Sequence, residues 1–277
     1  MQTLSEKTDA LRAILREAGH VAVAYSGGVD SSLLLRVACD TLGPTNVLAV
    51  IGASESLPTS NLDQAVAAAE AWGVRVQVVR TSELENPDFA RNPPDRCYHC
   101  KRELCETLTR AAEAYFGSRP LLVDGNQADD AGDWRPGRRA AREAGVRSPM
   151  AEAGFTKADV RELSRQLGIP HADRPAEACL ASRIPYGTTI TATLLARIAA
   201  AEQVLREAGF SGFRVRHHDK VARIEVAATD IPRLAAMGQE IAARIRAAAG
   251  YTYVALDLDG YRTGSLNAGL KRESGDQ

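Results

Sequence analysis

Val21-Ala22-Val23-Ala24-Tyr25-Ser26-Gly27-Gly28-Val29-Asp30-Ser31 joins a short apolar run to a helical pattern through a glycine-rich loop. The apolar run is rich in valine, as a buried strand of a parallel sheet should be, and the helical pattern continues to Ala38. Gly27 and Gly28 are expected to turn with positive φ and to let the backbone approach an anion closely. The first N–H groups of the helix would point at that anion, so the stretch predicts a phosphate site.

The side chains of this loop indicate ATP chemistry. Ser26 and Ser31 supply hydroxyl donors, whereas Asp30 would repel a bare phosphate, so we expect Asp30 to hold the Mg²⁺ that accompanies pyrophosphate. The lysine-bearing loop GxxxxGK[ST] and the dinucleotide motif GxGxxG do not occur in the sequence. Residues 26–31 instead resemble the SGGxDS signature of the PP-loop ATP pyrophosphatases. That resemblance implies cleavage of ATP between its α- and β-phosphates; a glycine turn that binds nothing is the alternative.

Composition and charge narrow the class of protein. The 277 residues include 34 basic and 35 acidic side chains, which leaves a net charge of −1. The overall charge therefore does not attract the protein to nucleic acid or to an anionic membrane. No run reaches membrane-spanning length, and the N-terminal amphipathic stretch lacks the apolar centre of a secretory signal. Five unevenly spaced cysteines argue against a disulfide framework, so we expect a cytoplasmic protein.

Strand and helix patterns alternate through the first part of the chain. Apolar runs at 47–51, 74–79 and 120–124 are separated by helical patterns, which predicts an α/β fold with a doubly wound parallel sheet. Ligands of such sheets bind beyond the carboxyl ends of the strands, near the switch in strand order. The loops 26–31, 52–56 and 125–130 begin at those ends and should converge on one nucleotide. Ser54 and Asn126 are therefore candidate nucleotide contacts.

After Gly187 the pattern changes, which predicts a nucleotide domain at 1–187 and a smaller α+β domain at 188–277. Residues 189–208 have a helical pattern, and the alternating runs 213–218 and 221–226 predict a hairpin. One further helix carrying Leu234, Met237, Ile241 and Ile245 and a strand at 251–258 follow. The polar tail 271–277 is expected to be disordered.

Three cysteines form a candidate metal site. Cys97 and Cys100 make a CxxC pair after the proline-rich approach 92–96, ahead of a helix expected near Lys101, and Cys179 lies in the loop 175–187. Three thiolates facing one cavity suit a [4Fe–4S] cluster with one open iron, whereas zinc in a structural site takes four ligands. A reduced thiol pair and a zinc half-site stay open as alternatives. Cys39 and Cys105 are expected in the core.

Several motifs coincide in one family. SGGVDS at 26–31, DRCYHCK at 95–101, DGNQADD at 124–130, RPGRRAAREAGVRSP at 135–149 and ACLASRIPYG at 178–187 together resemble the LarE family, and the resemblance extends to 258–267. It implies ATP-dependent sulfur insertion in the synthesis of the nickel-pincer nucleotide. The carboxylates of pyridinium-3,5-biscarboxylic acid mononucleotide would be adenylated and converted to thiocarboxylates, with release of AMP and pyrophosphate.

The resemblance also carries implications for the sulfur. Family members with a single cysteine, at the position of Cys179, give up that side-chain sulfur and retain dehydroalanine, so each chain acts once. Members with an added cysteine pair are similar to this sequence, which implies that Cys97, Cys100 and Cys179 hold a [4Fe–4S] cluster whose open iron carries a sulfide. Such a protein needs sulfide or another sulfur donor. The family is often hexameric, which implies a homo-oligomer.

Cationic side chains are expected to bind the phosphate and carboxylates of the substrate. Arg214 and Arg216 alternate on a predicted strand, so their guanidinium groups share one face and could hold a phosphate. Arg183 is a second candidate, and the alternative for the strand pair is a solvated face matched to Glu225 across the hairpin. Asp129 and Asp130 could assist Mg²⁺, orient arginines or cap the following helix.

The sequence leaves three other functions open. Some PP-loop enzymes that thiolate tRNA also combine SGGxDS with a CxxC pair, but they require a basic groove that the neutral charge does not favour. An amidotransferase or synthetase of the NAD type would use ammonia, and no glutaminase domain is present in the sequence. An adenine-nucleotide sensor would bind ATP without releasing pyrophosphate.

Overall fold

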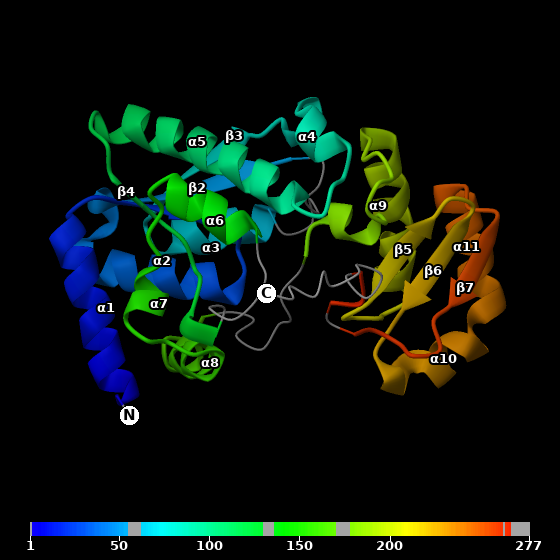
Figure 1. Ribbon diagram of the computed structural model, residues 1–277. Helices are drawn as coiled ribbons and strands as arrows, with labels where there is room; N and C mark the ends of the chain where they lie inside the picture. The colour runs from blue at the N-terminus through cyan, green and yellow to red at the C-terminus, as the bar shows by residue number, and fades with distance from the viewer. Residues whose placement is uncertain (1, 55–61, 130–135, 170–177, 263, 267–277) are drawn as a thin grey trace, which may run out of the picture. The chain divides into compact units, whose positions relative to one another are not determined.

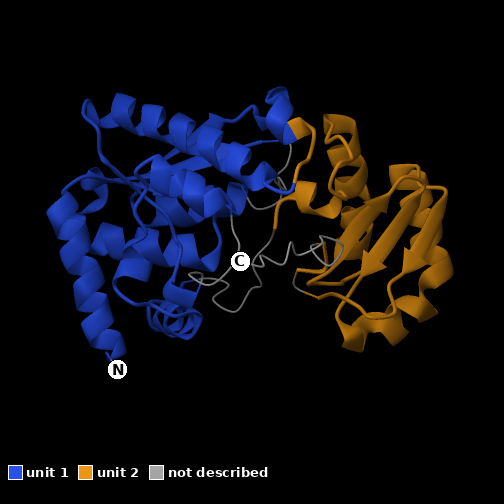
Figure 2. Ribbon diagram, in the orientation of Figure 1, with its two compact units in different colours: residues 1–89, 94–177 blue, residues 90–93, 178–277 orange. Residues whose placement is uncertain are grey.

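The computed structural model describes residues 2–54, 62–129, 136–169, 178–262 and 264–266. The chain forms two compact units (Figure 2): residues 1–89 with 94–177, and residues 90–93 with 178–277. Each unit has its own sheet, which confirms the expected α/β class with a smaller C-terminal α+β part. In the described ranges, no helix has the length and apolar character needed to cross a bilayer.

The first unit is built on a parallel sheet of order β3-β2-β1-β4 (Figure 1). Its central strand β1 pairs with β2 on one side and β4 on the other, so that Val21 lies between Val47 and Leu121. The chain runs outward from β1 to β3 and then returns to the opposite side of β1. The strand order therefore switches beside β1, where a ligand site is expected. The strands are β1 Val21–Ala24, β2 Val47–Ala53, β3 Arg75–Arg80 and β4 Leu121–Val123.

Helices cover both faces of this sheet because alternate strand residues point to opposite sides. Val21 and Val23 pack with Leu33 of α2 and Leu11 of α1 on one face, whereas Ala22 packs near α5 on the other. The helices are α1 Leu4–Ala18, α2 Val29–Leu42, α3 Leu62–Ala71, α4 Pro87–Ala90, α5 Arg96–Phe116, α6 Pro136–Glu143, α7 Pro149–Glu152 and α8 Lys157–Gln166; single 3-10 turns span Pro44–Asn46 and Glu83–Glu85.

The second unit has a sheet of order β5-β6-β7, in which β5 and β6 form the expected antiparallel hairpin and β7 runs parallel to β6. The single helix expected around Leu234–Ile245 is wrong, because two helices meet at Met237 and Gly238, where glycine weakens helix continuation. The elements are a 3-10 turn Leu180–Arg183, α9 Ala192–Glu207, β5 Arg214–His218, β6 Val221–Glu225, a 3-10 turn Ala228–Asp230, α10 Ile231–Ala236, α11 Gly238–Ala249 and β7 Tyr253–Leu256.

A short segment from the middle of the nucleotide-domain sequence belongs to the second unit. Asn92 is completely buried there and adopts φ +57, and its amide donates to the carbonyl oxygens of Pro185 at 2.8 Å and Thr188 at 3.0 Å. The compact second unit therefore begins at residue 178, ahead of the boundary predicted at 187, and includes residues 90–93. The tail 271–277, for which disorder was predicted, lies outside the described residues.

Candidate active site

Residues 26–31, the predicted pyrophosphate site and from here on the pyrophosphate turn, follow β1 at the switch in strand order. The amide of Tyr25 donates to the carbonyl of Val50 at 2.9 Å, after which the chain turns at Gly27 with φ +73. The Ser31 hydroxyl closes the turn, since it accepts from the Ser26 amide at 3.2 Å and lies 3.1 Å from the Gly28 carbonyl oxygen, to which it donates. The turn is thus held by hydrogen bonds between its own residues.

Gly28 has a different role from the one its sequence position predicted. Its φ is −73, so the expectation of positive φ there is wrong; Gly28 is instead the N-cap of α2, without a side chain to cap the helix. The first N–H groups of a helix have no partner within the helix, and the helix dipole favours an anion beside them. Ser26, Gly27 and Gly28 are all exposed. The turn can therefore accept pyrophosphate oxygens from solvent.

The loop after β4 lies against the start of α2. A Cβ added to Gly125 would be 2.9 Å from the amide nitrogen of Ser31, so only glycine allows this approach. Next to it, the Asn126 amide donates to Asp124 at 2.7 Å, and the buried Asp124 also accepts from Ser148 at 2.7 Å. The structure therefore brings the loops 26–31 and 125–129 together.

The third loop follows β2. Ser54, directly after that strand, is half-buried, whereas residues 55 and 56 lie outside the described residues.

Lys157 is a residue of this site that the sequence analysis missed. Its Nζ donates to both carboxylate oxygens of Asp30, at 2.6 and 2.8 Å, and its backbone N–H donates to Asp129 at 2.7 Å. Lys157 is the first residue of α8, whose start is fixed by a capping box between Thr156 and Asp159. Asp129 thus caps α8 rather than the helix that follows it directly. Asp130 lies outside the described residues.

The donor chemistry at Asp30 fits magnesium. A carboxylate beside a phosphate-binding turn is the oxygen ligand that Mg²⁺ uses in nucleotide sites. The ammonium group of Lys157 already holds one positive charge on that carboxylate. A cation therefore suits this position, and Asp30 is the residue that would hold it.

The CxxC pair lies inside a helix rather than ahead of one. α5 begins at Arg96, so the expected start near Lys101 is wrong, because the extending effect of the prolines stops at Asp95, the N-cap. Cys97 and Cys100 are consequently one turn apart on one helical face, with Cys97 exposed and Cys100 half-buried. The expected core cysteines, Cys39 and Cys105, are buried.

Three contacts connect the cysteine turn and the residues beside it to their surroundings in the first unit. Gly137 of α6 packs on it so closely that an added Cβ would lie 3.2 Å from the Cys97 carbonyl oxygen. Lys101 Nζ lies 4.0 Å from the carboxylate of Asp124, next to the nucleotide loop. Tyr98, between the two cysteines, donates its hydroxyl to Glu143 of α6 at 2.5 Å. The cysteine pair is therefore held on a rigid helix pair in the same unit as the pyrophosphate turn.

Cys179 belongs to the second unit and is the N-cap of the 3-10 turn Leu180–Arg183. Its carbonyl oxygen accepts from the Ser182 hydroxyl at 2.7 Å and from Arg183 Nη1 at 2.9 Å. Within the described part of the chain, no three side chains of the metal-binding kinds gather at one point. Three thiolates are a donor set that can hold an iron–sulfur cluster, but these three cysteines belong to two different units, so their convergence stays a prediction.

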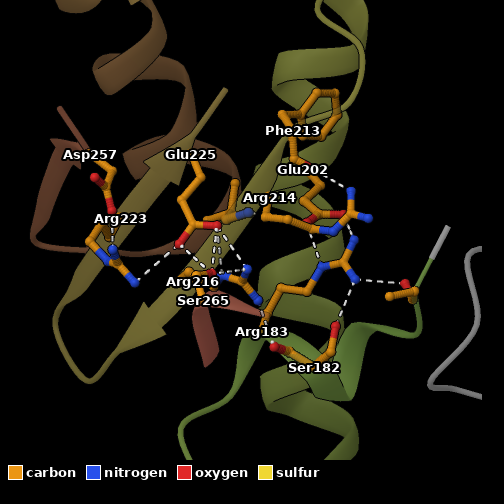
Figure 3. Close-up of polar contacts among 12 residues, drawn as sticks. Ser182, Arg183, Glu202, Phe213, Arg214, Arg216, Arg223, Glu225, Asp257 and Ser265 are labelled. Atoms are coloured by element: carbon orange, nitrogen blue, oxygen red, sulfur yellow. Dashed lines mark hydrogen bonds and ion pairs between the residues drawn. The ribbon is translucent and has the colours of Figure 1, made fainter. Parts of the chain in front are cut away.

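A basic pocket of about 280 Å³ lies in the second unit (Figure 3 shows most of its polar residues). Arg183 is buried and forms a two-pronged ion pair with Glu202, at 2.8 and 3.1 Å. Arg216 donates from Nη2 and Nε to one carboxylate oxygen of the completely buried Glu225, at 2.8 and 3.0 Å. The described residues that line the pocket are Arg183, Pro185, Tyr186, Arg216, His218, Arg223, Ser265 and Leu266.

Arg214 is placed differently from Arg216. Its Nη1 donates to the Phe213 carbonyl at 2.6 Å and its guanidinium lies 4.9 Å from the ring centre of Tyr261, and it is not among the described residues that line the pocket. Burial, followed by the positive charges of Arg183 and Arg216, lowers the pKa of Arg214. Arg216 forms an ion pair with Glu225 across the hairpin, as one of the alternatives predicted. The strand face that carries it is buried, whereas that alternative expected a solvated face.

Comparisons with known proteins show the family of the chain. The NAD synthase family model matches residues 3–90, which contain the pyrophosphate turn. The pyridinium-3,5-bisthiocarboxylic acid mononucleotide synthase of Lactiplantibacillus plantarum is 39% identical over 272 residues, covering 98% of this chain and 98% of its own. The chain belongs to the LarE family. It is an enzyme of the PP-loop superfamily, and the similarity spans both units.

Two other relatives define the extent of the similarity. A Synechocystis protein of uncharacterised function is 41% identical to the LarE chain over 272 residues, covering 97% of this chain and all of its own. An NH(3)-dependent NAD(+) synthetase of Methanopyrus kandleri is 39% identical over 176 residues, which are 60% of each chain. The synthetase resemblance is therefore partial.

The basic pocket of the second unit contains residues that the sequence did not single out. Arg223 and His218 enter it from the two strands of the hairpin, and Ser265 enters from the C-terminal segment to accept from Arg216 at 2.8 Å. Burial, followed by the charges of Arg223 and Arg216, lowers the pKa of His218. The alternation of charged residues on the predicted hairpin could have indicated Arg223, because the register of the hairpin places it opposite Arg216.

Proposed function

We propose that this LarE enzyme adenylates the carboxylates of pyridinium-3,5-biscarboxylic acid mononucleotide and converts them to thiocarboxylates for the nickel-pincer nucleotide. The observation that carries the proposal is the near-complete coverage of both chains in the match to the Lactiplantibacillus plantarum synthase. The NAD synthetase match covers only 60% of this chain. An amidotransfer reaction is therefore the weaker candidate, although it would use the same ATP turn.

The first half-reaction uses the pyrophosphate turn. A substrate carboxylate oxygen forms a bond to the α-phosphorus of ATP, and the bond from that phosphorus to the bridging oxygen breaks, which releases pyrophosphate. The exposed N-terminus of α2, with Ser26, Gly27, Gly28 and Ser31, supplies donors for the departing phosphates. Asp30 would hold the Mg²⁺ that neutralises them, and Ser54 and Asn126 are the proposed contacts from the neighbouring loops.

The second half-reaction exchanges oxygen for sulfur. The acyl carbon of the adenylate is attacked by a sulfur nucleophile at the oxidation level of sulfide, AMP leaves with the carboxylate oxygen, and a proton is released. Cys97, Cys100 and Cys179 would hold a [4Fe–4S] cluster, which supplies an open iron site for binding sulfur. The roles of the chain's own residues are to present these thiolates and, through Arg183, to fix the backbone at Cys179. Sulfide or a sulfur donor is the proposed partner.

The pocket of the second unit is the proposed phosphate site of the mononucleotide. Arg183, Arg216 and Arg223 place positive charge around it, and their carboxylate partners hold the guanidinium groups in fixed orientations. Arg214 adds charge from outside the described lining. Tyr186 and Ser265 supply further polar atoms at the pocket wall. We expect this chain to act as a cytoplasmic homo-oligomer, as proposed from its family resemblance.

Anaerobic turnover followed by intact-protein mass spectrometry tests the proposal. The enzyme is incubated with ATP, Mg²⁺, sulfide and the biscarboxylic mononucleotide, while pyrophosphate, AMP and thiocarboxylate are quantified. We expect thiocarboxylate in multiple turnovers, with iron and acid-labile sulfide in the protein. Loss of the mass of hydrogen sulfide from Cys179 in an iron-free protein would replace the cluster proposal with the sacrificial one. Pyrophosphate release that depends instead on tRNA or on ammonia would overturn the proposed substrate.

A further inference from the structure

The ion pair between Lys157 and Asp30 is open to ligands of the pyrophosphate turn. Lys157 Nζ contacts both carboxylate oxygens, at 2.6 and 2.8 Å, yet the two side chains remain 29% and 27% exposed. Both side chains are only half-buried, so water offsets part of the cost when the ammonium group changes partners. The pair is therefore suited to exchange more than to holding the fold.

Only the side chain of Lys157 is free to move. Its backbone N–H is bonded to Asp129 at 2.7 Å, and the capping box of Thr156 and Asp159 fixes the first turn of α8 around it. A lysine side chain is a flexible four-carbon stem with a compact charge at its end. Its ammonium group can therefore reach a new acceptor near Asp30 while the helix stays in place.

The charges at Asp30 favour an exchange when ATP binds. A Mg²⁺ ion on this carboxylate would repel the ammonium group, and the phosphates at the adjacent helix N-terminus would attract it. Asp30 is the second residue of α2, so its carboxylate and the pyrophosphate turn are neighbours in the chain. Ammonium, magnesium and phosphate would thus compete within one small volume.

We propose that Lys157 occupies the Mg²⁺ position on Asp30 in the nucleotide-free enzyme and moves to a phosphate oxygen of ATP when Mg²⁺ takes that carboxylate. The inference rests on the proposed function only in assigning ATP and Mg²⁺ to this turn. The exchange breaks and forms ionic hydrogen bonds alone. Lys157 has two effects: it weakens binding of Mg²⁺ to the empty enzyme, and it strengthens binding of Mg·ATP.

The test compares K157M and K157R with K7M. Lys7 is the matched control, because its ammonium group forms an ion pair of 2.6 Å with Asp159, on the same helix as Lys157, instead of with Asp30. Mg²⁺ affinity without nucleotide is measured by thermal shift, and Mg·ATP affinity by calorimetry at constant ionic strength. Neither measurement needs the substrate or the cluster.

Opposite changes in the two affinities are expected for K157M. Its Mg²⁺ affinity without nucleotide should rise, while its Mg·ATP affinity should fall by about tenfold or more, as for loss of a charge-assisted hydrogen bond. K157R should retain most of the Mg·ATP affinity, and K7M should change neither. A K157M protein with both affinities lowered, or with Mg·ATP affinity within about twofold of the wild type, overturns the inference. Wild-type protein that binds Mg·ATP but makes no thiocarboxylate contradicts the proposed function alone.

Discussion

Arg216 forms its ion pair with Glu225, although the register of the hairpin places Glu225 opposite Arg214. The diagonal pairing leaves Arg216 at the pocket and turns Arg214 toward the ring of Tyr261. Arg223 also approaches Glu225, at 3.2 Å. One fully buried carboxylate therefore orients two of the three arginines that line the pocket.

Removing the charge of Glu225 should destabilise the enzyme strongly. The variant E225Q leaves Arg216 buried without its carboxylate, and breaking one side of a buried pair typically costs about 3–5 kcal/mol. The free energy of unfolding in urea measures the effect. The control is E207Q, because Glu207 forms an exposed pair with Arg244 and its loss should cost about 1 kcal/mol or less. Equal losses for the two variants would contradict this account of the pocket.

A methyl group at Gly125 should impair ATP use more than folding. In G125A the added Cβ would lie 2.9 Å from the Ser31 amide and displace the pyrophosphate turn, so we expect pyrophosphate release to fall at least about tenfold. The comparison variant is G238A, since a Cβ at Gly238 meets no atom within 4 Å. Steady-state pyrophosphate release and the thermal midpoint are measured for both. A G125A enzyme with unchanged release would show that the two loops need not touch.

Arg183 should matter for sulfur transfer and less for adenylation. Its Nη1 donates to the carbonyls of Ala178 and Cys179, at 2.6 and 2.9 Å, while its Nε and Nη2 hold Glu202. The single ammonium group of a lysine cannot keep both sets of contacts. We expect R183K to lower thiocarboxylate formation by roughly a hundredfold, as for small misplacements of a reacting group. Exchange of labelled pyrophosphate into ATP reports adenylation separately. If that exchange falls as far as thiocarboxylate formation does, Arg183 acts mainly through substrate binding.

The proposed cluster predicts which cysteines are needed for iron. C97S and C100S should each reduce iron and acid-labile sulfide after anaerobic reconstitution, because a cluster held by three thiolates loses one ligand. C39A should keep both at the wild-type level, since Cys39 packs in the core and its thiol faces the Trp72 carbonyl at 3.4 Å. Iron content and visible absorbance are the measurements. Full iron in C97S and C100S would contradict the cluster assignment.

Acid should weaken the second unit through His217. Burial, followed by the charge of Arg197, lowers the pKa of His217, whose Nδ1 lies 3.2 Å from the Tyr251 hydroxyl. The unfolded chain therefore takes up this proton at higher pH than the folded one does, so stability present above about pH 6.5 is lost as the pH falls through the folded pKa. H217Q should show a smaller loss of unfolding free energy between pH 7 and pH 5. An unchanged pH profile would contradict this role for His217.

Much of the nucleotide-binding unit was readable from the sequence because its signals are local. The valine-rich strand, the glycine turn and the helix from Val29 are adjacent in the chain, and the alternation of later strands and helices then fixes a parallel sheet. The helix start at Arg96 was missed because the two prolines ahead of it predict an extended backbone. The helix begins only two residues after the second proline, with Asp95 as its N-cap. The split at Gly238 was missed because the apolar spacing continues across it.

The side-chain partners were harder to predict because they depend on contacts between distant segments. Lys157 and Asp30 are far apart in sequence, and nothing in the Thr156–Asp159 capping box indicates which loop α8 begins beside. The diagonal partner of Glu225 depends on side-chain direction, which register alone does not give. The convergence of Cys97, Cys100 and Cys179 stays a prediction, because the thiols come from two units.

Asn92 makes the second unit discontinuous in sequence. Its amide satisfies carbonyl groups on either side of Gly187, while the segment 90–93 that carries it is bounded at both ends by the chain of the first unit. A fragment cut at residue 178 would thus lack this buried amide, and would leave backbone acceptors without their donor. The polypeptide passes between the units at three points in sequence instead of one. A truncation or fusion at residue 178 therefore yields an incomplete second unit, which lacks residues 90–93.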